Sequence, residues 1–417
     1  MMSDGAQGHM LTPGKLMDLP RFNPFSAEFR ETPYGVYHQL RELNPLHKVL
    51  GMWVVTRHAD VMSILRDRSC NSSIIPKLID NQAAKFGRDN APFQRLVYKS
   101  IVFTENPDHH RLRKLMNIAF SRSAIDQLQH SIEDIIQDLL RDAYQQGGMD
   151  IISGLAHPLP LRLMCEWIGL PAEMHSTIDT WTHALRFLLE PGLMVKDDFE
   201  KVSTVLDEYM EYLSSVIAER KNNPRQDLIS QLLDLQIDGD RLTHEELIFV
   251  CIMCFVAGIE TTKSLIGNGI NALLEHPEQY CLLQERPQLI PCCVQEVLRF
   301  ETPIQHTKRF ATKELILDGH VIKAGDQILL CLGSANRDEL VFPHADRFDI
   351  ERKTKGHLAF GYGMHGCLGG LLAGRQMQAV LSRLLKGPGL IRRHNNPTWQ
   401  ASSIIVRSLS SLDVQFV

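Results

Sequence analysis

The chain has 417 residues, of which 44% are hydrophobic and 22% are charged, and its formal net charge at pH 7 is −5. This composition is typical of a soluble globular protein, and an acidic balance without long basic runs argues against nucleic-acid binding. No linker-like stretch, internal repeat or low-complexity block divides the sequence. We therefore expect a polar tail over residues 1–20 and a single domain over residues 21–417.

The sequence holds nine cysteines, an odd number, and most of them lie in apolar surroundings. No secretory signal opens the chain, so we expect free thiols and a cytoplasmic protein. Cys251-x-x-Cys254 has the spacing of redox and zinc pairs, but it lies inside the apolar stretch Leu247–Ile259 without a second pair. Two core cysteines are therefore favoured. The stretch is shorter than the roughly 20 residues of a membrane span, and we expect no membrane association.

The first third of the chain mixes short strands and helices. Residues 52–56 (MWVVT) predict a strand, and residues 59–67 predict the helix that follows it. Residues 70–104 hold few periodic segments and many polar, Gly and Pro residues. We expect a long loop there, of the kind that is usually functional or mobile.

From about residue 106 to residue 301 the pattern is helical. The longest predicted helix begins at Thr243, which forms a capping box with Glu246, and continues to about Glu275, where Pro277 stops it. Roughly 30 helical residues span about 45 Å. Because its middle is apolar on all sides, this helix must lie inside the protein.

The last quarter contains small β elements. Residues 315–322 predict a hairpin around Asp318-Gly319, and residues 327–332 predict another strand. A cysteine-containing loop, its helix and a short β-like tail close the chain. The sequence therefore predicts a mainly α fold with small β-sheets.

The segment Phe360–Gly369 (FGYGMHGCLG) is the most informative part of the sequence. Cys367 stands in a glycine-rich turn before an apolar helix. Glycine permits left-handed backbone angles and close approach to a flat ligand, and backbone N–H groups at a helix start stabilise a thiolate. A turn with an incidental buried thiol is the alternative reading.

The pattern Phe-x-x-Gly-x-His-x-Cys-x-Gly resembles the haem-binding loop of the cytochrome P450 family. The resemblance extends from about Tyr34 to Phe416. It implies haem b (iron-protoporphyrin IX) with Cys367 as the axial iron ligand, in a triangular prism that holds the haem between a long central helix and the Cys-loop helix. It also implies cofactor-binding roles for the loop residues Phe360, Gly361, His365 and Gly369.

The stretch Ala257–Thr262 places a glycine, an acid and two hydroxyls in a buried helix, where they are costly unless used. A threonine hydroxyl that bonds the carbonyl one turn back loosens a helix and makes room beside a cofactor. The stretch resembles the family's oxygen-binding groove. The resemblance implies that Ala257 and Gly258 border the haem, that Thr261 bonds the iron-bound oxygen and that Glu260 relays protons. A distorted helix with a satisfied Glu–Thr pair is the alternative.

Two further motifs belong to the same resemblance. Glu296-x-x-Arg299 resembles the family's Glu-x-x-Arg motif, with Arg347 as the expected third member of a structural trio. Cations must converge on the two haem propionates. By motif position these are His109, Arg113, Arg309 and His365, each of which is alternatively a solvated surface cation.

The resemblance implies a haem-thiolate monooxygenase that inserts one oxygen atom from O2 into an apolar small molecule. We expect electrons from a ferredoxin and its ferredoxin reductase, which dock near Arg352, Lys353, Lys355 and His357. A solvated loop is the alternative reading of that patch. A peroxide-dependent fatty-acid peroxygenase and a non-catalytic haem sensor are the alternative functions; retention of Glu260 and Thr261 favours the monooxygenase.

The expected substrate is a polyketide- or macrolide-like secondary metabolite, either free or bound to a carrier protein. We expect its pocket walls from residues 70–104, 181–199, 304–306 and 402–405 and from the helix before Gly258. These segments supply apolar residues that suit an apolar substrate or simply pack two helices together: Phe187, Leu188, Leu189, Leu193 and Met194.

Overall fold

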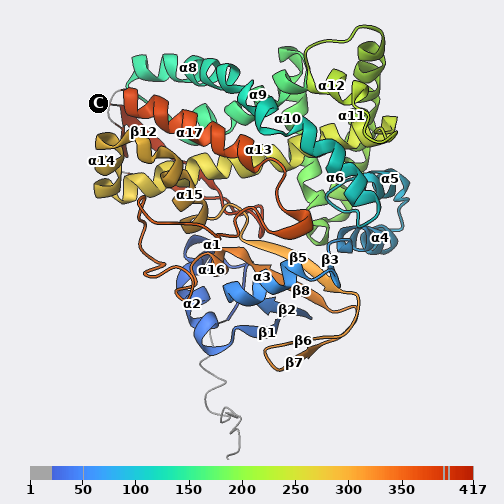
Figure 1. The fold of residues 1–417 in the computed structure, drawn as a ribbon, viewed down its shortest axis with the longest axis horizontal. Coiled ribbons are helices and arrows are strands. Elements are labelled where there is room, and N and C mark those ends of the chain that lie inside the picture. The colour runs from blue at the N-terminus through green and yellow to red at the C-terminus, as the bar shows by residue number, and fades with distance from the viewer. Residues whose placement is uncertain (1–20, 50, 388–389, 393–394, 417) are drawn as a thin grey trace, which may run out of the picture.

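The computed structural model describes residues 21–49, 51–387, 390–392 and 395–416, so the predicted tail over residues 1–20 lies outside the described residues. A broad layer of helices narrows toward a smaller sheet region, and the outline is roughly triangular (Figure 1). The predicted mainly α architecture with small sheets is confirmed.

The α-helices account for most of the described chain. They are α1 (Ala27–Glu31), α2 (Pro33–Leu43), α3 (His58–Arg66), α4 (Ile74–Phe86), α5 (Ala91–Lys99), α6 (Asp108–Ala119), α7 (Arg122–Asp126), α8 (Gln129–Gln146), α9 (Pro158–Ile168), α10 (His175–Leu185), α11 (Lys196–Asn222), α12 (Leu228–Asp234), α13 (His244–Glu275), α14 (Pro277–Glu285), α15 (Ile290–Phe300), α16 (Leu332–Ala335) and α17 (Gly370–Lys386). The single-turn elements are the π-helix η2 (Ile152–Ala156) and the 3₁₀ turns η3 (Ala172–Met174), η4 (Arg186–Leu188), η5 (Pro191–Leu193), η6 (Pro287–Leu289) and η7 (Gly363–His365).

The largest sheet has the strand order β1-β2-β8-β5-β3. Its strands are β1 (Leu46–Val49), β2 (Met52–Val55), β8 (Gln327–Cys331), β5 (His306–Ala311) and β3 (Cys70–Asn71), and only the β2–β8 pair of this described sheet is parallel. The smaller sheets are β4 (Gly148–Asp150) with β12 (Asp413–Phe416) and β9 (Leu390–Arg392), β10 (Thr398–Trp399) with β11 (Leu409–Ser411), and β6 (Leu315–Leu317) with β7 (His320–Ile322).

Local signals placed several elements correctly. The strand predicted at 52–56 is β2, the helix predicted at 59–67 is α3, and the strand predicted at 327–332 is β8. The hairpin β6–β7 turns at Asp318 and Gly319, whose φ angles are 47° and 74°. Two positive φ angles match the right-handed twist of the flanking strands, which is why Asp-Gly predicts this turn.

The long helix α13 begins and ends as predicted. Thr243 Oγ1 accepts a hydrogen bond from the Glu246 N–H (3.2 Å), and the Glu246 carboxylate accepts one from the Thr243 N–H (2.8 Å). The whole helix is long and apolar enough to span a membrane, although the apolar stretch Leu247–Ile259 within it is too short to do so. Of its most apolar 18-residue window, 67% is buried inside the protein, as in the core helix of a soluble protein.

The loop predicted over residues 70–104 is wrong, because that segment contains α4 and α5. The periodicity is present in α4, where Ile75, Ile79 and Ala83 are all buried, four residues apart. Pro76 stands in the first turn, where proline is tolerated, and Gly87 caps the helix at a φ of 63°. Polar and Gly/Pro residues therefore start and stop helices here instead of preventing them.

Helix α13 runs through the middle of the helical layer and packs against α9, α11, α15 and α17 (Figure 1). At Gly269 the missing side chain lets two helices approach. A Cβ there would collide with the Met377 side chain of α17 and would lie 3.0 Å from Val297 of α15. Helices α13, α15 and α17 are therefore brought together at this glycine.

Candidate active site

The cysteine loop is held in a shape that only glycine permits. Gly361 and Gly363 have φ angles of 65° and 74°, and a Cβ on Gly363 would lie 2.8 Å from the Leu65 carbonyl oxygen. The Cys367 N–H donates to the Phe360 carbonyl (2.8 Å) and closes the loop. The loop therefore presents Cys367 at the start of α17, as its glycine spacing predicts.

The Cys367 sulfur is exposed, yet enclosing protein raises its pKa through desolvation. Hydrogen bonds from the Gly369 and Gly370 backbone N–H groups and the nearby Arg113 guanidinium act in the opposite direction. Donors already aimed at the sulfur favour a thiolate once a metal cation compensates its burial. Burial also raises the pKa of Cys251 and Cys254, but no group among the described residues acts in the opposite direction there, and both thiols pack into the apolar core as predicted.

The middle of α13 opens onto free space. Ala257 is exposed although most of this helix is buried, and a Cβ on Gly258 would meet no atom within 4 Å. The Thr261 hydroxyl donates to the Ala257 carbonyl (2.7 Å), as predicted. The expected loosening is not seen, because α13 is unbroken here; small side chains provide the room. Helix α17, which follows Cys367, packs against α13 (Figure 1).

Basic side chains converge beside the cysteine loop. The rings of His109 and His365 are 4.4 Å apart, and Arg113 Nη1 donates to the Gly366 carbonyl (2.7 Å). Burial, followed by the charges of His365 and Arg113, lowers the pKa of His109 to about 4. Repelling, desolvated bases of this kind suit an anionic ligand.

Arg309 joins the same region from β5. It is 7% exposed, burial lowers its pKa, and its guanidinium donates only to Thr307 Oγ1 and the Lys308 carbonyl among the described residues. Glu105 attracts Arg309 and also accepts from His365 Nε2 (3.2 Å). The sequence analysis had not identified Glu105; the acid lies 260 positions from its histidine.

These features fit a haem. Two N–H groups point at the Cys367 sulfur, small residues leave space along α13, and four bases stand near the loop for two carboxylates. The fold and this cysteine-centred site together define a haem-thiolate oxygenase.

The comparisons with known proteins agree. Residues 172–387 match the family model for cytochrome P450. The polyketide biosynthesis cytochrome P450 PksS of Bacillus subtilis (strain 168) is 32% identical over 379 residues, which make up 89% of this chain and 92% of that protein. The chain belongs to the cytochrome P450 family and is a monooxygenase, an oxidoreductase.

Solved structures give the same fold. CalO2 superposes with a TM-score of 0.88 at 31% identity, over 95% of this chain and 99% of its own. P450BioI, solved in complex with an acyl carrier protein ligated to hexadec-9Z-enoic acid, has a TM-score of 0.86 at 33% identity, over 94% of this chain and 100% of its own. The fold predicted from the resemblance is confirmed.

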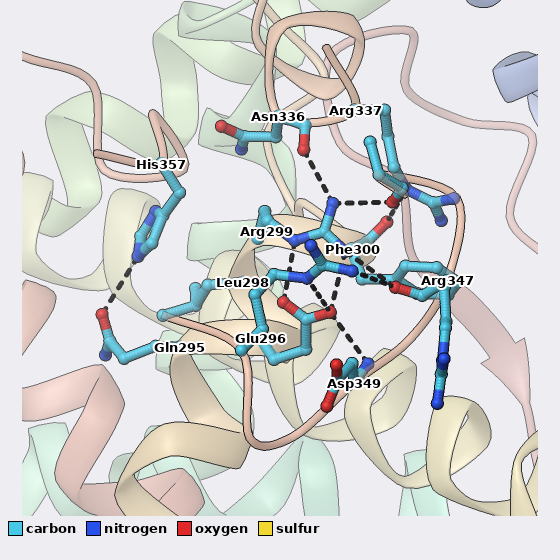
Figure 2. A network of polar contacts seen from close by, with 12 residues as sticks. Gln295, Glu296, Leu298, Arg299, Phe300, Asn336, Arg337, Arg347, Asp349 and His357 are labelled. Carbon is cyan, nitrogen blue, oxygen red and sulfur yellow. Dashed lines mark hydrogen bonds and ion pairs between the residues drawn. The ribbon is translucent and has the colours of Figure 1, made fainter. Parts of the chain in front are cut away.

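The Glu-x-x-Arg network joins α15 to the segment before the cysteine loop (Figure 2). Arg299 Nε and Nη2 donate to the two Glu296 oxygens (2.7 and 2.8 Å), and both side chains are fully buried. The predicted third member, Arg347, is wrong, because its side chain makes no described contact with Glu296. Arg352 Nε pairs with Glu296 instead (3.2 Å), and Arg347 supplies only its carbonyl oxygen. The two arginines lie five positions apart in one turn-rich segment, so spacing could not choose between them.

The same contacts change the predicted docking patch. Arg352 is committed to Glu296, and His357 Nε2 bonds Gln295 Oε1 (3.0 Å) while burial lowers its pKa to about 4. Neither offers a free positive charge to a partner. Lys353 and Lys355 are exposed and remain candidates.

Thr261 lines a cavity of about 450 Å³. The tail segment and part of the predicted 181–199 segment line it, but of the five predicted apolar residues only Leu189 does so. Leu188 and Met194 are buried in the core, and α4 and α5 contribute no lining residue. Gln305 and His306 line a separate cavity of about 30 Å³. The larger cavity is rich in charged side chains, which the sequence analysis did not anticipate.

Glu260 is one of those charged residues. Its carboxylate contacts Lys263 Nζ at 2.7 Å, and its carbonyl accepts from Ser264 Oγ (2.6 Å). Lys263 was not identified from the sequence. The available signal was a lysine directly after the polar stretch of an apolar helix.

Proposed function

We propose that this P450 carries haem b and inserts one oxygen atom from O2 into an apolar small molecule, a polyketide- or macrolide-like secondary-metabolite intermediate. The observation that carries the haem assignment is the Cys367 sulfur, which accepts two backbone N–H groups in its glycine turn. The relative PksS, whose name assigns it to polyketide biosynthesis, supports the substrate class.

In this proposal Cys367 is the iron ligand, and bound haem supplies oxygen activation aided by electron donation from the thiolate. His109, Arg113, Arg309 and His365 hold its propionates. Phe360, Gly361 and Gly369 support the cofactor from the loop. Ala257 and Gly258 border the cofactor from α13, where a Cβ on Gly258 would meet no atom within 4 Å.

Thr261 and Glu260 are the proposed proton-handling residues. The Thr261 hydrogen is engaged by the Ala257 carbonyl, so its oxygen lone pairs are free to accept a hydrogen bond. Glu260 lines the cavity together with Thr261, where a carboxylate can exchange protons with entering water. The two residues thus connect solvent with the reacting centre.

Electrons come, in this proposal, from a ferredoxin and its reductase, and the exposed lysines Lys353 and Lys355 contribute to docking. We further propose a single domain over residues 21–417 that works in the cytoplasm, where nine free thiols stay reduced. The proposal includes both a free substrate and a substrate bound to a carrier protein. The P450BioI complex with an acyl carrier protein supports the carrier-bound form.

The spectrum of the reduced, CO-treated protein tests the haem assignment. We expect the Soret shift of thiolate ligation, and we expect Cys367→Ala to abolish it. An unchanged spectrum in Cys367→Ala would overturn the ligand assignment.

Turnover measurements test the proposed monooxygenase reaction. Hydrophobic compounds that shift the haem from low to high spin are incubated with NADPH, ferredoxin and reductase, or with hydrogen peroxide alone. Product that depends on NADPH supports the monooxygenase. Product with peroxide only would identify a peroxygenase, and binding without product in either arm would identify a sensor.

A further inference from the structure

A lysine in the middle of the central helix requires an explanation. Lys263 belongs to α13 and is 9% exposed, and a buried ammonium is costly unless it is paired. Its Nζ lies 2.7 and 2.8 Å from the two carboxylate oxygens of Glu260, so it contacts both. The lysine side chain is 11% exposed and that of Glu260 is 22% exposed.

Lys263 and Glu260 share the wall of the large cavity with Thr261. The cavity also reaches exposed residues, Thr180 and Lys201, so water can enter it from outside. The pair therefore shares a cavity that solvent can enter with the threonine that the proposed function assigns to proton transfer.

Every helical region around the cavity contributes titratable or charged groups, whereas the tail segment contributes none. On α13 these are Glu260 and Lys263; on α10, Asp179 and His183; before α9, His157; near η4, Arg186 and Glu190; and on α11, Lys201. His157 Nε2 pairs with Asp179 (3.1 Å). Glu190 accepts from Ser403 Oγ (2.6 Å) and from two backbone N–H groups.

That distribution leaves Lys263 as the cation that holds Glu260. The partners of Asp179 and Glu190 lie elsewhere, and Arg186 donates to the Ser402 carbonyl (3.3 Å). Burial and the charge of Arg186 lower the pKa of His183 and outweigh the opposite effect of the Glu260 charge, and no ion pair joins His183 to Glu260 among the described residues.

We propose that Lys263 is a positioning residue that fixes the Glu260 carboxylate beside Thr261 and so controls proton supply to the reaction. The inference rests on the proposed function. Glu260 takes a proton from cavity water, passes it toward Thr261 and returns to its ionised form. The water regains its proton from bulk solvent, and Lys263 keeps its own proton throughout.

Two measurements on the haem-loaded enzyme test the role of Lys263. The difference infrared spectrum between each protein and its Glu260→Gln derivative isolates the Glu260 carboxylate stretch, which should shift in Lys263→Met. With NADPH, ferredoxin, reductase and O2, and no organic ligand added, we expect the peroxide formed per NADPH to rise by roughly threefold in Lys263→Met, because displaced proton donors slow the proton-dependent reduction of O2 to water that competes with peroxide release.

Controls separate positioning from general damage. Lys263→Arg should retain the carboxylate band and the low peroxide yield, and so should Lys221→Met, which changes an exposed lysine of α11 outside the cavity. Normal haem spectra in all variants exclude misfolding. An unchanged band and peroxide yield in Lys263→Met would overturn the role of Lys263. A wild-type protein without thiolate ligation would instead overturn the proposed function.

Discussion

Two acid–base pairs with the same i, i+3 spacing occur on two helices of this P450. Glu296 and Arg299 on α15 are fully buried, and their donors and acceptors are consumed by each other, by Arg352 and by backbone groups. Glu260 and Lys263 on α13 line a cavity and keep contact with water. A pair enclosed on all sides braces a fold, whereas a pair at a cavity wall can take part in chemistry.

Removing the enclosed arginine should have the largest effect on stability. Arg299→Leu leaves the Glu296 carboxylate buried without its main partner, so we expect a loss of about 3–5 kcal/mol in the free energy of unfolding. Urea unfolding of the haem-loaded protein measures it. Arg286→Leu is the control, because its pair with Glu351 is half exposed (52% and 51%) and should change stability by less than about 1 kcal/mol. Equal losses in the two variants would contradict the comparison.

Removing Arg352, the third member of the network, should lower the free energy of unfolding by a smaller amount. Arg352 donates to Glu296 and to the Pro343, His344 and Arg347 carbonyls, so Arg352→Met should cost about 2 kcal/mol. Arg347→Met should cost less than about 0.5 kcal/mol, because only the backbone of that residue is used. Thermal unfolding of the two variants side by side decides which arginine completes the trio; the reverse order would restore the prediction made from sequence.

Acid should weaken the enclosed network through His357. Burial and the charge of Arg299 lower the native pKa of His357 to about 4, below the usual value of about 6.5. The unfolded chain therefore binds the extra proton first, and stability falls as pH drops from 6.5 to 4, by up to about 1.4 kcal/mol per pH unit. His357→Gln should reduce this slope by that amount when unfolding is followed between pH 7 and 4. A slope identical to wild type would show that His357 is not the titrating group.

The cavity pair should matter least for stability. Lys263→Met is expected to lower the free energy of unfolding by about 1 kcal/mol or less, because cavity water solvates the Glu260 carboxylate that remains. Chemical denaturation of Lys263→Met and Arg299→Leu in parallel makes the comparison direct. A loss as large as that of Arg299→Leu would class both pairs as structural.

The sequence predicted well what neighbouring residues decide. The capping box of α13, the Asp-Gly hairpin and the glycine turn around Cys367 are local signals, and all three are present. It failed where distant segments decide. The choice of Arg352 over Arg347, the contact between Glu105 and His365, and the charged cavity lining all depend on packing between elements far apart in sequence. The helices α4 and α5 were missed for another reason, since their starting prolines were taken as breaks.

Gly269 sits far from the sulfur and the threonine, yet it sets the spacing of three helices at once. Helix α13 carries the small-residue groove, α15 the buried arginine and α17 the chain that leaves the cysteine. A single methyl group at this point would displace the end of the Met377 side chain and press against Val297. A substitution at Gly269 therefore alters the packing of the helix that follows the haem ligand, although it touches neither haem nor substrate.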